Sequence, residues 1–117
     1  MTRGLADTSV FVARESGRPL AVDRLPTELE VSVAAGDVET RHRRLATLTQ
    51  ALTLSPVPVD EAVADAWARL RIVLRDAGAR MPLNDSWIAA TALALGVPVV
   101  TQDDDYARVA GLDVIRV

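Results

Sequence analysis

Short apolar runs alternate along the chain with segments of helical spacing, and this pattern predicts alternating strands and helices. Residues 4–7 form a small apolar run that ends in a carboxylate, and residues 29–33 alternate apolar and polar side chains. Both are typical of strands. Residues 97–101 are a continuous apolar run, as expected of a parallel strand covered on both faces. A last strand is predicted within residues 112–117.

Two helices with clear patterns are predicted in the second half of the chain. The first begins at Asp60 and ends before Gly78, because apolar residues recur at helical spacing and glycine commonly follows a helix end. The second runs from a cap at Asn84 to Gly96. Helices are also expected after residue 7 or 8, from 37 to about 52, and as one turn over 106–110. The tryptophans, at positions 67 and 87, are predicted to lie in the core.

The order of these elements predicts one α/β domain over residues 1–117. Alternating strands and helices favour a three-layer α/β/α sandwich with a mainly parallel sheet. Pro56 and Pro58 cannot donate hydrogen bonds to a neighbouring strand, so the strand that contains them is expected at a sheet edge. Half of the residues are hydrophobic but only 3% are aromatic, so the core must consist mainly of Val, Leu, Ile and Ala.

Composition excludes several classes of chemistry. The chain has no cysteine, which excludes disulfides, thiolate catalysis and cysteine-bound zinc. All 13 basic residues are arginine, which excludes mechanisms that need a lysine beside the reacting aspartate. No signal-peptide pattern is present, and no apolar run approaches the roughly 20 residues that span a membrane. We therefore expect a cytoplasmic protein that is not inserted in a membrane.

Three carboxylates stand at the ends of predicted apolar elements. Asp7 ends the first strand, Asp103 follows the fourth strand, and Asp85 opens the helix that leads into the fourth strand. The carboxyl ends of parallel strands meet at one edge of a sheet, and a right-handed crossover brings the start of that helix to the same edge. The three side chains therefore converge if the first and fourth strands are neighbours.

Converging carboxylates repel one another unless a cation lies between them. Without lysine, a hard divalent cation such as Mg²⁺ or Mn²⁺ is the natural partner, because these ions take oxygen ligands. Such an ion can polarise a phosphodiester and activate a water molecule. The hydroxyls of Thr8, Ser9 and Thr101 are expected to orient the carboxylates or their waters.

Each carboxylate also has a purely structural interpretation. Asp7 can cap a helix, and Asp85 can stabilise a helix start through the helix dipole. Residues 103–105 can be an ordinary acidic turn. The placement of all three at one predicted edge favours a common site.

The segments "LADTSVF", "NDSWIAATA" and "VVTQDDDY", in this order, resemble a PIN domain. Together with "ARESGRPL" and "DVETRHRRL", the chain is most similar to the VapC-type toxins of bacterial toxin–antitoxin pairs. By motif position, the resemblance implies that Asp7, Asp85 and Asp103 are metal ligands and that Asp105 is a further acidic neighbour. It implies a Mg²⁺-dependent ribonuclease that cleaves RNA such as tRNA loops. It also implies a VapB-type antitoxin that blocks the site, and a homodimer.

RNA contacts are expected from arginines rather than from stacked aromatic rings. Arg14 and Arg18 leave the first strand on the side of the candidate site. Arginine contacts to phosphate weaken steeply with salt.

One departure from the family leaves alternatives open. The family has a glutamate on the helix after the second strand, and no residue here matches it. About a dozen residues, roughly three helical turns, are expected to be missing after Val33. This favours an alternative in which a catalytically weakened module mainly binds a VapB-like antitoxin. A structure-specific DNA nuclease with the same metal chemistry is a further alternative.

Overall fold

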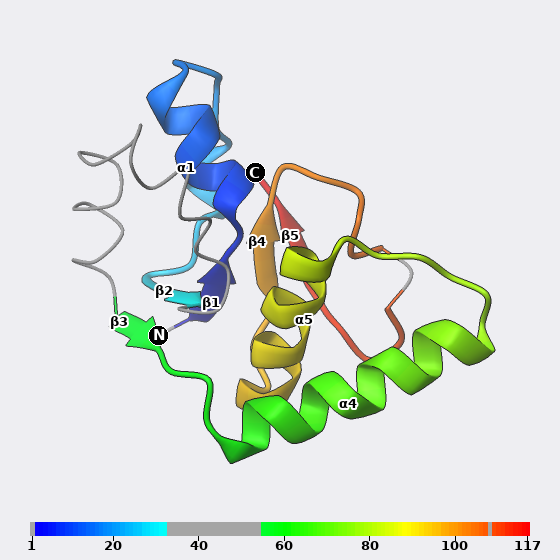
Figure 1. Ribbon diagram of the computed structural model, residues 1–117. Helices are drawn as coiled ribbons and strands as arrows, with labels where there is room; N and C mark the ends of the chain where they lie inside the picture. Colours follow the sequence, from blue (N-terminus) through cyan, green and yellow to red (C-terminus); the bar gives the residue numbers. More distant parts are fainter. Residues whose placement is uncertain (1, 33–54, 108) are drawn as a thin grey trace.

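The computed structural model describes residues 2–32, 55–107 and 109–117. These residues form a five-stranded sheet in which every strand pair is parallel (Figure 1). The order is β3-β2-β1-β4-β5, with β1 Arg3–Ala6, β2 Glu28–Ser32, β3 Ser55–Val57, β4 Val99–Thr101 and β5 Val114–Arg116. The predicted parallel α/β sheet is confirmed, and β1 and β4 are neighbours. The proline-containing strand β3 lies at the end of this order, as expected.

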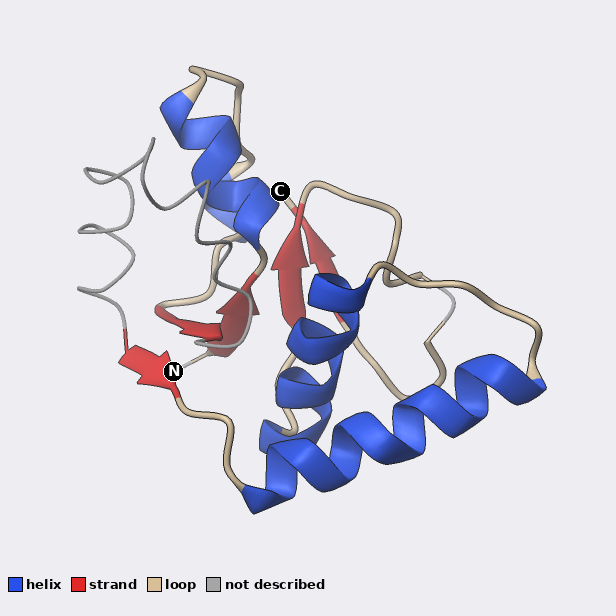
Figure 2. Ribbon diagram, in the orientation of Figure 1, coloured by secondary structure: helices blue, strands red, loops and turns tan. Residues whose placement is uncertain are grey.

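Helices cover the sheet in separate layers (Figure 2). The helix α5, Leu83–Leu95, packs on β1, β2 and β4, and α4, Glu61–Asp76, packs on α5. The helix α1, Thr8–Glu15, connects β1 to β2, and a short 3-10 helix, η1, spans Val22–Arg24. Because β2 and β4 flank β1 on opposite sides, right-handed crossovers place α1 and α5 on opposite faces of the sheet. The helix predicted over 37–52 lies outside the described residues.

The core forms between α5 and the central strands. Leu5, Val99 and Ala89 are fully buried there, and the side chains are mainly aliphatic, as composition predicts. Space is also limited at Gly4 of β1, beside Pro26 and Val100. A Cβ atom at that position would lie 2.7 Å from Pro26 Cγ and 2.8 Å from Val100 Cγ2. Only glycine fits between these neighbours without a shift.

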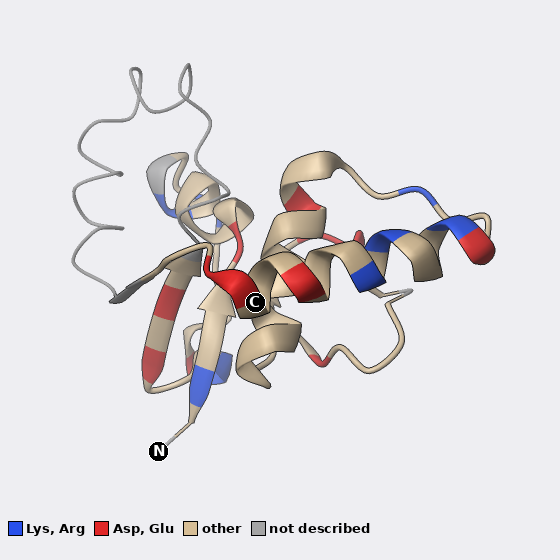
Figure 3. Ribbon diagram, turned by 60° about the horizontal axis from the view of Figure 1, so that its bottom comes forward, with Lys and Arg blue, Asp and Glu red and all other residues tan. Residues whose placement is uncertain are grey.

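The charges on α4 are mostly divided along the helix. Glu61 and Asp65 lie in its first half and Arg69, Arg71 and Arg75 in its second half, although the last residue of the helix, Asp76, is again acidic (Figure 3). The position of Glu61 in the first turn and of Arg75 in the last turn is favourable, because the helix dipole attracts anions to the N-terminus and cations to the C-terminus. Among the described residues, no helix combines the length and apolar character needed to cross a bilayer.

Two predicted details at the helices are wrong. The cap of α5 is Pro82 rather than Asn84, and the helix begins at Leu83. Proline suits this boundary because its ring restricts φ and it has no N–H group to leave unpaired. The described residues within 106–110 form turns rather than a helical turn.

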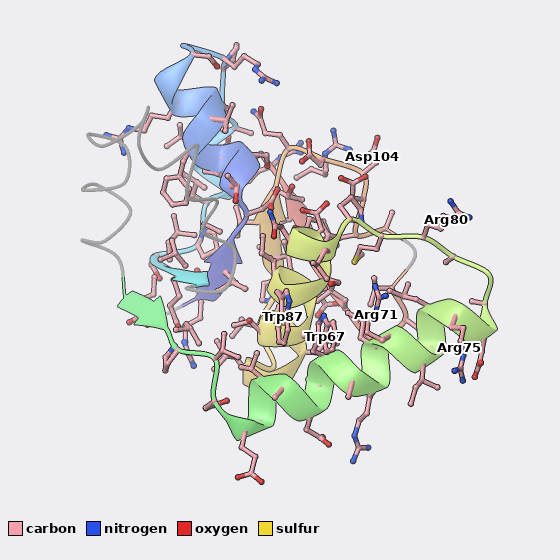
Figure 4. All side chains as sticks on the ribbon, viewed as in Figure 1. Trp67, Arg71, Arg75, Arg80, Trp87 and Asp104 are labelled. Atoms are coloured by element: carbon pink, nitrogen blue, oxygen red, sulfur yellow. The ribbon has the colours of Figure 1, made fainter. Side chains whose placement is uncertain are left out.

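The tryptophans were predicted to lie in the core, and the structure places both at its margin, with Trp67 packed against the core cluster. Trp67 and Trp87 are partly exposed and stack with their ring centroids 4.4 Å apart and their planes 3° apart, between α4 and α5 (Figure 4). The indole N–H of Trp67 donates to Ser86 Oγ at 3.0 Å, and Arg71 lies 5.6 Å from the centre of the Trp67 ring. The stacked rings therefore contribute to the contact between α4 and α5.

Candidate active site at the carboxyl edge of the sheet

Asp7 occupies the junction between β1 and α1. It is the N-cap of α1, and its Oδ2 accepts a hydrogen bond from the backbone N–H of Ser9 at 3.4 Å. Its side chain is almost completely buried, with 1% exposed. A buried carboxylate is costly unless it is hydrogen-bonded. The capping interpretation and the site interpretation are thus compatible, because one carboxylate both caps the helix and faces the sheet edge.

A directed chain of hydrogen bonds holds Asp7. An ionised carboxylate only accepts, so the Thr101 hydroxyl donates to Asp7 Oδ2 at 2.8 Å. The Ser9 hydroxyl, 3.0 Å from Thr101 Oγ1, must then donate to it. Ser9 Oγ itself accepts the backbone N–H of Gln102 at 2.9 Å. These contacts place the hydroxyls of Ser9 and Thr101 beside the Asp7 carboxylate, and their role in orienting it for a metal ion stays a prediction.

Asp85 meets Asp7 through a third residue. The hydroxyl of Tyr106 lies 2.8 Å from Asp7 Oδ1 and 3.2 Å from Asp85 Oδ1. Tyr106 is fully buried in the turn after β4. Burial and the two negative charges raise the pKa of the Tyr106 phenol well above its usual value, so it remains a donor. Tyr106 was not among the residues predicted for the site.

The pKa values of two further acidic residues are raised, those of Asp85 on α5 and of Asp103 in the turn after β4. Burial raises the pKa of Asp85 to about 7, and its hydrogen bond with Asp105 and the negative charges of Asp7 and Asp105 add to the effect. Burial also raises the pKa of Asp103, again with help from the charges of Asp7 and Asp105. Asp104 differs from these residues, because it forms an ion pair with Arg116 of β5 (Figure 4).

The carboxylates of Asp7, Asp85 and Asp103 line one pocket. Its volume is about 270 Å³, and the residues around it are Asp7, Thr8, Ser9, Val12, Arg18, Asp85 and Asp103. The structure thus brings the three predicted carboxylates together, along with two of the predicted hydroxyl residues and Arg18. Arg14 is exposed on α1 and does not line the pocket.

The donor set suits a hard divalent cation. It consists of carboxylate and hydroxyl oxygens. Besides burial, the negative charges of Asp7 and Asp105 raise the pKa values of Asp85 and Asp103, and a cation would relieve this repulsion. Within the described ranges, no three acidic, cysteine or histidine side chains are grouped closely enough to hold a metal ion by themselves. Mg²⁺ does not require such a set, since it usually keeps several waters and binds through one or two carboxylates.

The sequence is similar to a known domain family and to two ribonucleases of one bacterium. The model of the PIN domain family matches residues 5–112. Ribonuclease VapC5 of Mycobacterium tuberculosis is 46% identical over 128 aligned positions, which cover 97% of this chain and 95% of that protein. Ribonuclease VapC4 of the same organism is 43% identical over 98% of this chain and 97% of its own length.

The fold is also similar to that of chains in solved VapBC structures. VapBC-5 from M. tuberculosis, a member of the VapBC family of toxin–antitoxin systems, has a chain with a TM-score of 0.82 and 37% identity over the full length of both chains. VapBC2 from Rickettsia felis, solved with a DNA fragment from its promoter, has a TM-score of 0.79 at 17% identity over 98% of both chains, which shows the same fold.

The alignment with VapC5 is also informative about length. It extends over 128 positions, more than the 117 residues of this chain. VapC5 therefore has residues inside the aligned region that have no counterpart here. The predicted position of the shortfall, after Val33, lies outside the described residues, and so does the backbone spacing there that would test it.

Proposed function

This chain belongs to the PIN domain family, with the VapC ribonucleases as its relatives, and we propose that it is a divalent-metal-dependent endoribonuclease. The observation that carries the proposal is the convergence of Asp7, Asp85 and Asp103 on one pocket at the carboxyl edge of the sheet. The chain has no lysine and no cysteine to support another acid–base or nucleophilic mechanism. Mg²⁺ or Mn²⁺ is the proposed cofactor.

The proposed metal ligands are Asp7, Asp85 and Asp103. Asp105, which lies beside Asp85, is a further candidate ligand. When bound, the ion would polarise the phosphodiester and lower the pKa of a coordinated water molecule. Asp7 is restrained at both carboxylate oxygens, by Tyr106 at Oδ1 and by Thr101 at Oδ2. Such hydrogen bonds orient ligating carboxylates and raise metal affinity.

A first experiment tests metal dependence and the ligands together. We expect the purified protein to cleave single-stranded RNA with Mg²⁺ or Mn²⁺ and to lose this activity in excess EDTA. Asp103→Asn should abolish cleavage, because it removes one anionic ligand while conserving shape. Asp23→Asn is a matched control, since Asp23 is exposed on η1 and does not line the pocket. Undiminished cleavage in EDTA would exclude a metal-dependent mechanism. Cleavage of DNA in preference to RNA would exclude RNA as the main substrate.

The proposed partners are a VapB-type antitoxin, an RNA such as tRNA, and a second copy of the chain. The similarity to the toxin–antitoxin structure VapBC-5 over the full length supports the antitoxin. Because the substrate is RNA, we place the protein in the cytoplasm. Co-expression with a VapB-type protein followed by size-exclusion chromatography tests complex formation. Light scattering of the toxin alone tests whether it is a homodimer.

The longer alignment with VapC5 favours a second candidate function. If the missing positions include the family glutamate, the metal site has one carboxylate fewer and binds the ion more weakly. The chain would then act mainly by binding an antitoxin. Tight antitoxin binding without RNA cleavage at saturating Mn²⁺ would support this alternative over the ribonuclease.

A further inference from the structure

The acidic pocket poses an electrostatic problem for an RNA substrate. Asp7, Asp85 and Asp103 line it, and Asp105 lies against Asp85. Three carboxylates and one divalent cation still carry a net negative charge, and a phosphodiester is itself an anion. The substrate therefore needs a positive group at the pocket besides the metal ion. Among the described residues that line the pocket, Arg18 is the one cationic side chain.

The end of α1 determines where Arg18 stands. Gly17 has a φ of 71°, the left-handed conformation that glycine adopts readily. The N–H of Arg18 donates to Ala13 O at 2.8 Å, and the N–H of Gly17 donates to Arg14 O at 3.4 Å. This pair of hydrogen bonds is a Schellman motif, which closes the helix and holds the next residue against its last turn. The backbone of Arg18 is thus tied to α1.

Gln102 connects Pro19, the residue after Arg18, to the side of the pocket that Asp7 lines. Its side-chain Nε2 donates to the backbone carbonyl of Pro19 at 3.0 Å. Its backbone N–H donates to Ser9 Oγ, which continues through Thr101 to Asp7. Gln102 therefore connects the loop that carries Arg18 with the hydrogen bonds that orient Asp7. Arg18 is exposed and forms no ion pair with any described residue, so its guanidinium remains available for a ligand.

We propose that Arg18 contacts a non-bridging oxygen of the phosphate that is cleaved, and that Gln102 is the positioning residue that keeps Arg18 at the pocket. The inference rests on the proposed ribonuclease function. In the reaction a water oxygen bonds to phosphorus, the bond from phosphorus to the leaving ribose oxygen breaks, and the proton lost by the water is replaced by one on the leaving oxygen. Negative charge grows on the non-bridging oxygens, and a permanently protonated guanidinium stabilises it.

The test is a double-mutant cycle on RNA cleavage at saturating Mn²⁺. We expect Arg18→Ala to lower kcat about 100-fold, as for loss of one donor to transition-state charge. Gln102→Met keeps the side-chain length but removes the N–H donor, and it should lower kcat at least about tenfold through misplacement of Arg18. The double variant should equal Arg18→Ala alone. Arg18→Lys should recover part of the loss, because it restores the charge without the planar fork.

Further measurements separate this role from a structural one. The affinity for Mn²⁺ should be unchanged in both single variants, since neither residue is a proposed ligand of the ion, and the midpoint of thermal unfolding should be unchanged in Arg18→Ala, since Arg18 is exposed. The salt dependence of single-stranded RNA binding, measured in EDTA, should fall by about 0.7 in slope for Arg18→Ala. Arg75→Ala is the matched control, because Arg75 is exposed on α4 and pairs with Asp76 instead of facing the pocket (Figure 4).

Two results would overturn the inference while leaving the ribonuclease function intact. One is that the wild-type protein cleaves RNA and Arg18→Ala does so with the same kcat. The other is a double variant in which the two losses multiply, because Gln102 would then act independently of Arg18. Absence of cleavage by the wild-type protein would instead overturn the proposed function and this inference with it.

Discussion

Tyr106 donates a hydrogen bond from its buried hydroxyl to Asp7 Oδ1 at 2.8 Å, across 99 positions of sequence. The hydroxyl oxygen of Tyr106 also lies 3.2 Å from Asp85 Oδ1. One phenol therefore sets the separation of two proposed metal ligands that come from different elements. Because its ring is fully buried, Tyr106 cannot move away from the site without a change in the core.

We predict that Tyr106→Phe weakens metal binding. The substitution conserves the ring and removes only the hydroxyl, so Asp7 and Asp85 lose their common partner. Loss of such a hydrogen bond to a ligand typically lowers metal affinity about 10- to 100-fold. Isothermal titration with Mn²⁺ measures the effect, and an unchanged dissociation constant would show that the hydroxyl has no part in positioning the ligands.

Thr101→Val should destabilise the protein and impair the site. Valine has nearly the same shape as threonine, but Thr101 is fully buried and its Oγ1 contacts Asp7, Ser9 and the N–H of Asp103. Leaving these groups without a partner should lower the free energy of unfolding by about 1–3 kcal/mol. Thr101→Ser keeps the hydroxyl and serves as the control in urea denaturation. Equal stability of the valine and serine variants would contradict the prediction.

The stability of the metal-free protein should depend on Asp85 between about pH 4 and pH 7. The pKa of Asp85 rises from 3.8 to about 7 on folding, so the folded state binds more protons in this range. The free energy of unfolding therefore decreases as pH increases through this window. Asp85→Asn removes the contribution, and its thermal midpoint in EDTA should exceed that of the wild type increasingly toward pH 7. A difference that is constant with pH would disprove the assignment.

Gly4→Ala should destabilise the fold without any contact to the pocket. The added methyl group would lie 2.7 Å from Pro26 Cγ and 2.8 Å from Val100 Cγ2, so Gly4 or these neighbours must shift. Overpacking of this kind typically costs about 1–3 kcal/mol. Gly78→Ala is an instructive comparison, because a Cβ there meets nothing within 4 Å and its cost comes only from the φ of 64°. Chemical denaturation of both variants measures the two effects.

The described part of the fold follows from sequence patterns to a large extent. Alternation of strands and helices indicated the parallel sheet, and Pro56, with Pro58 just after the strand, indicated that β3 lies at the sheet edge. Asp7 and Asp103 could be assigned to one edge because they follow strands that run in the same direction. The start of α5 was misplaced at Asn84, since two neighbouring residues, Asn84 and Pro82, both have the chemistry of a helix start and only packing selects between them.

The sequence by itself determined that Asp7, Asp85 and Asp103 lie at one edge of the sheet, where they line one pocket, because their positions at the ends of elements are local properties of the chain. It did not determine what holds them. Tyr106 and Gln102 lie in an irregular turn with no periodicity, and their partners Asp7 and Pro19 are 99 and 83 positions away. Side-chain hydrogen bonds over such distances depend on the loop path and on rotamers, which hydrophobic patterns do not encode. The tertiary structure alone therefore decided that a buried phenol separates two carboxylates and that an amide ties Arg18 to their pocket.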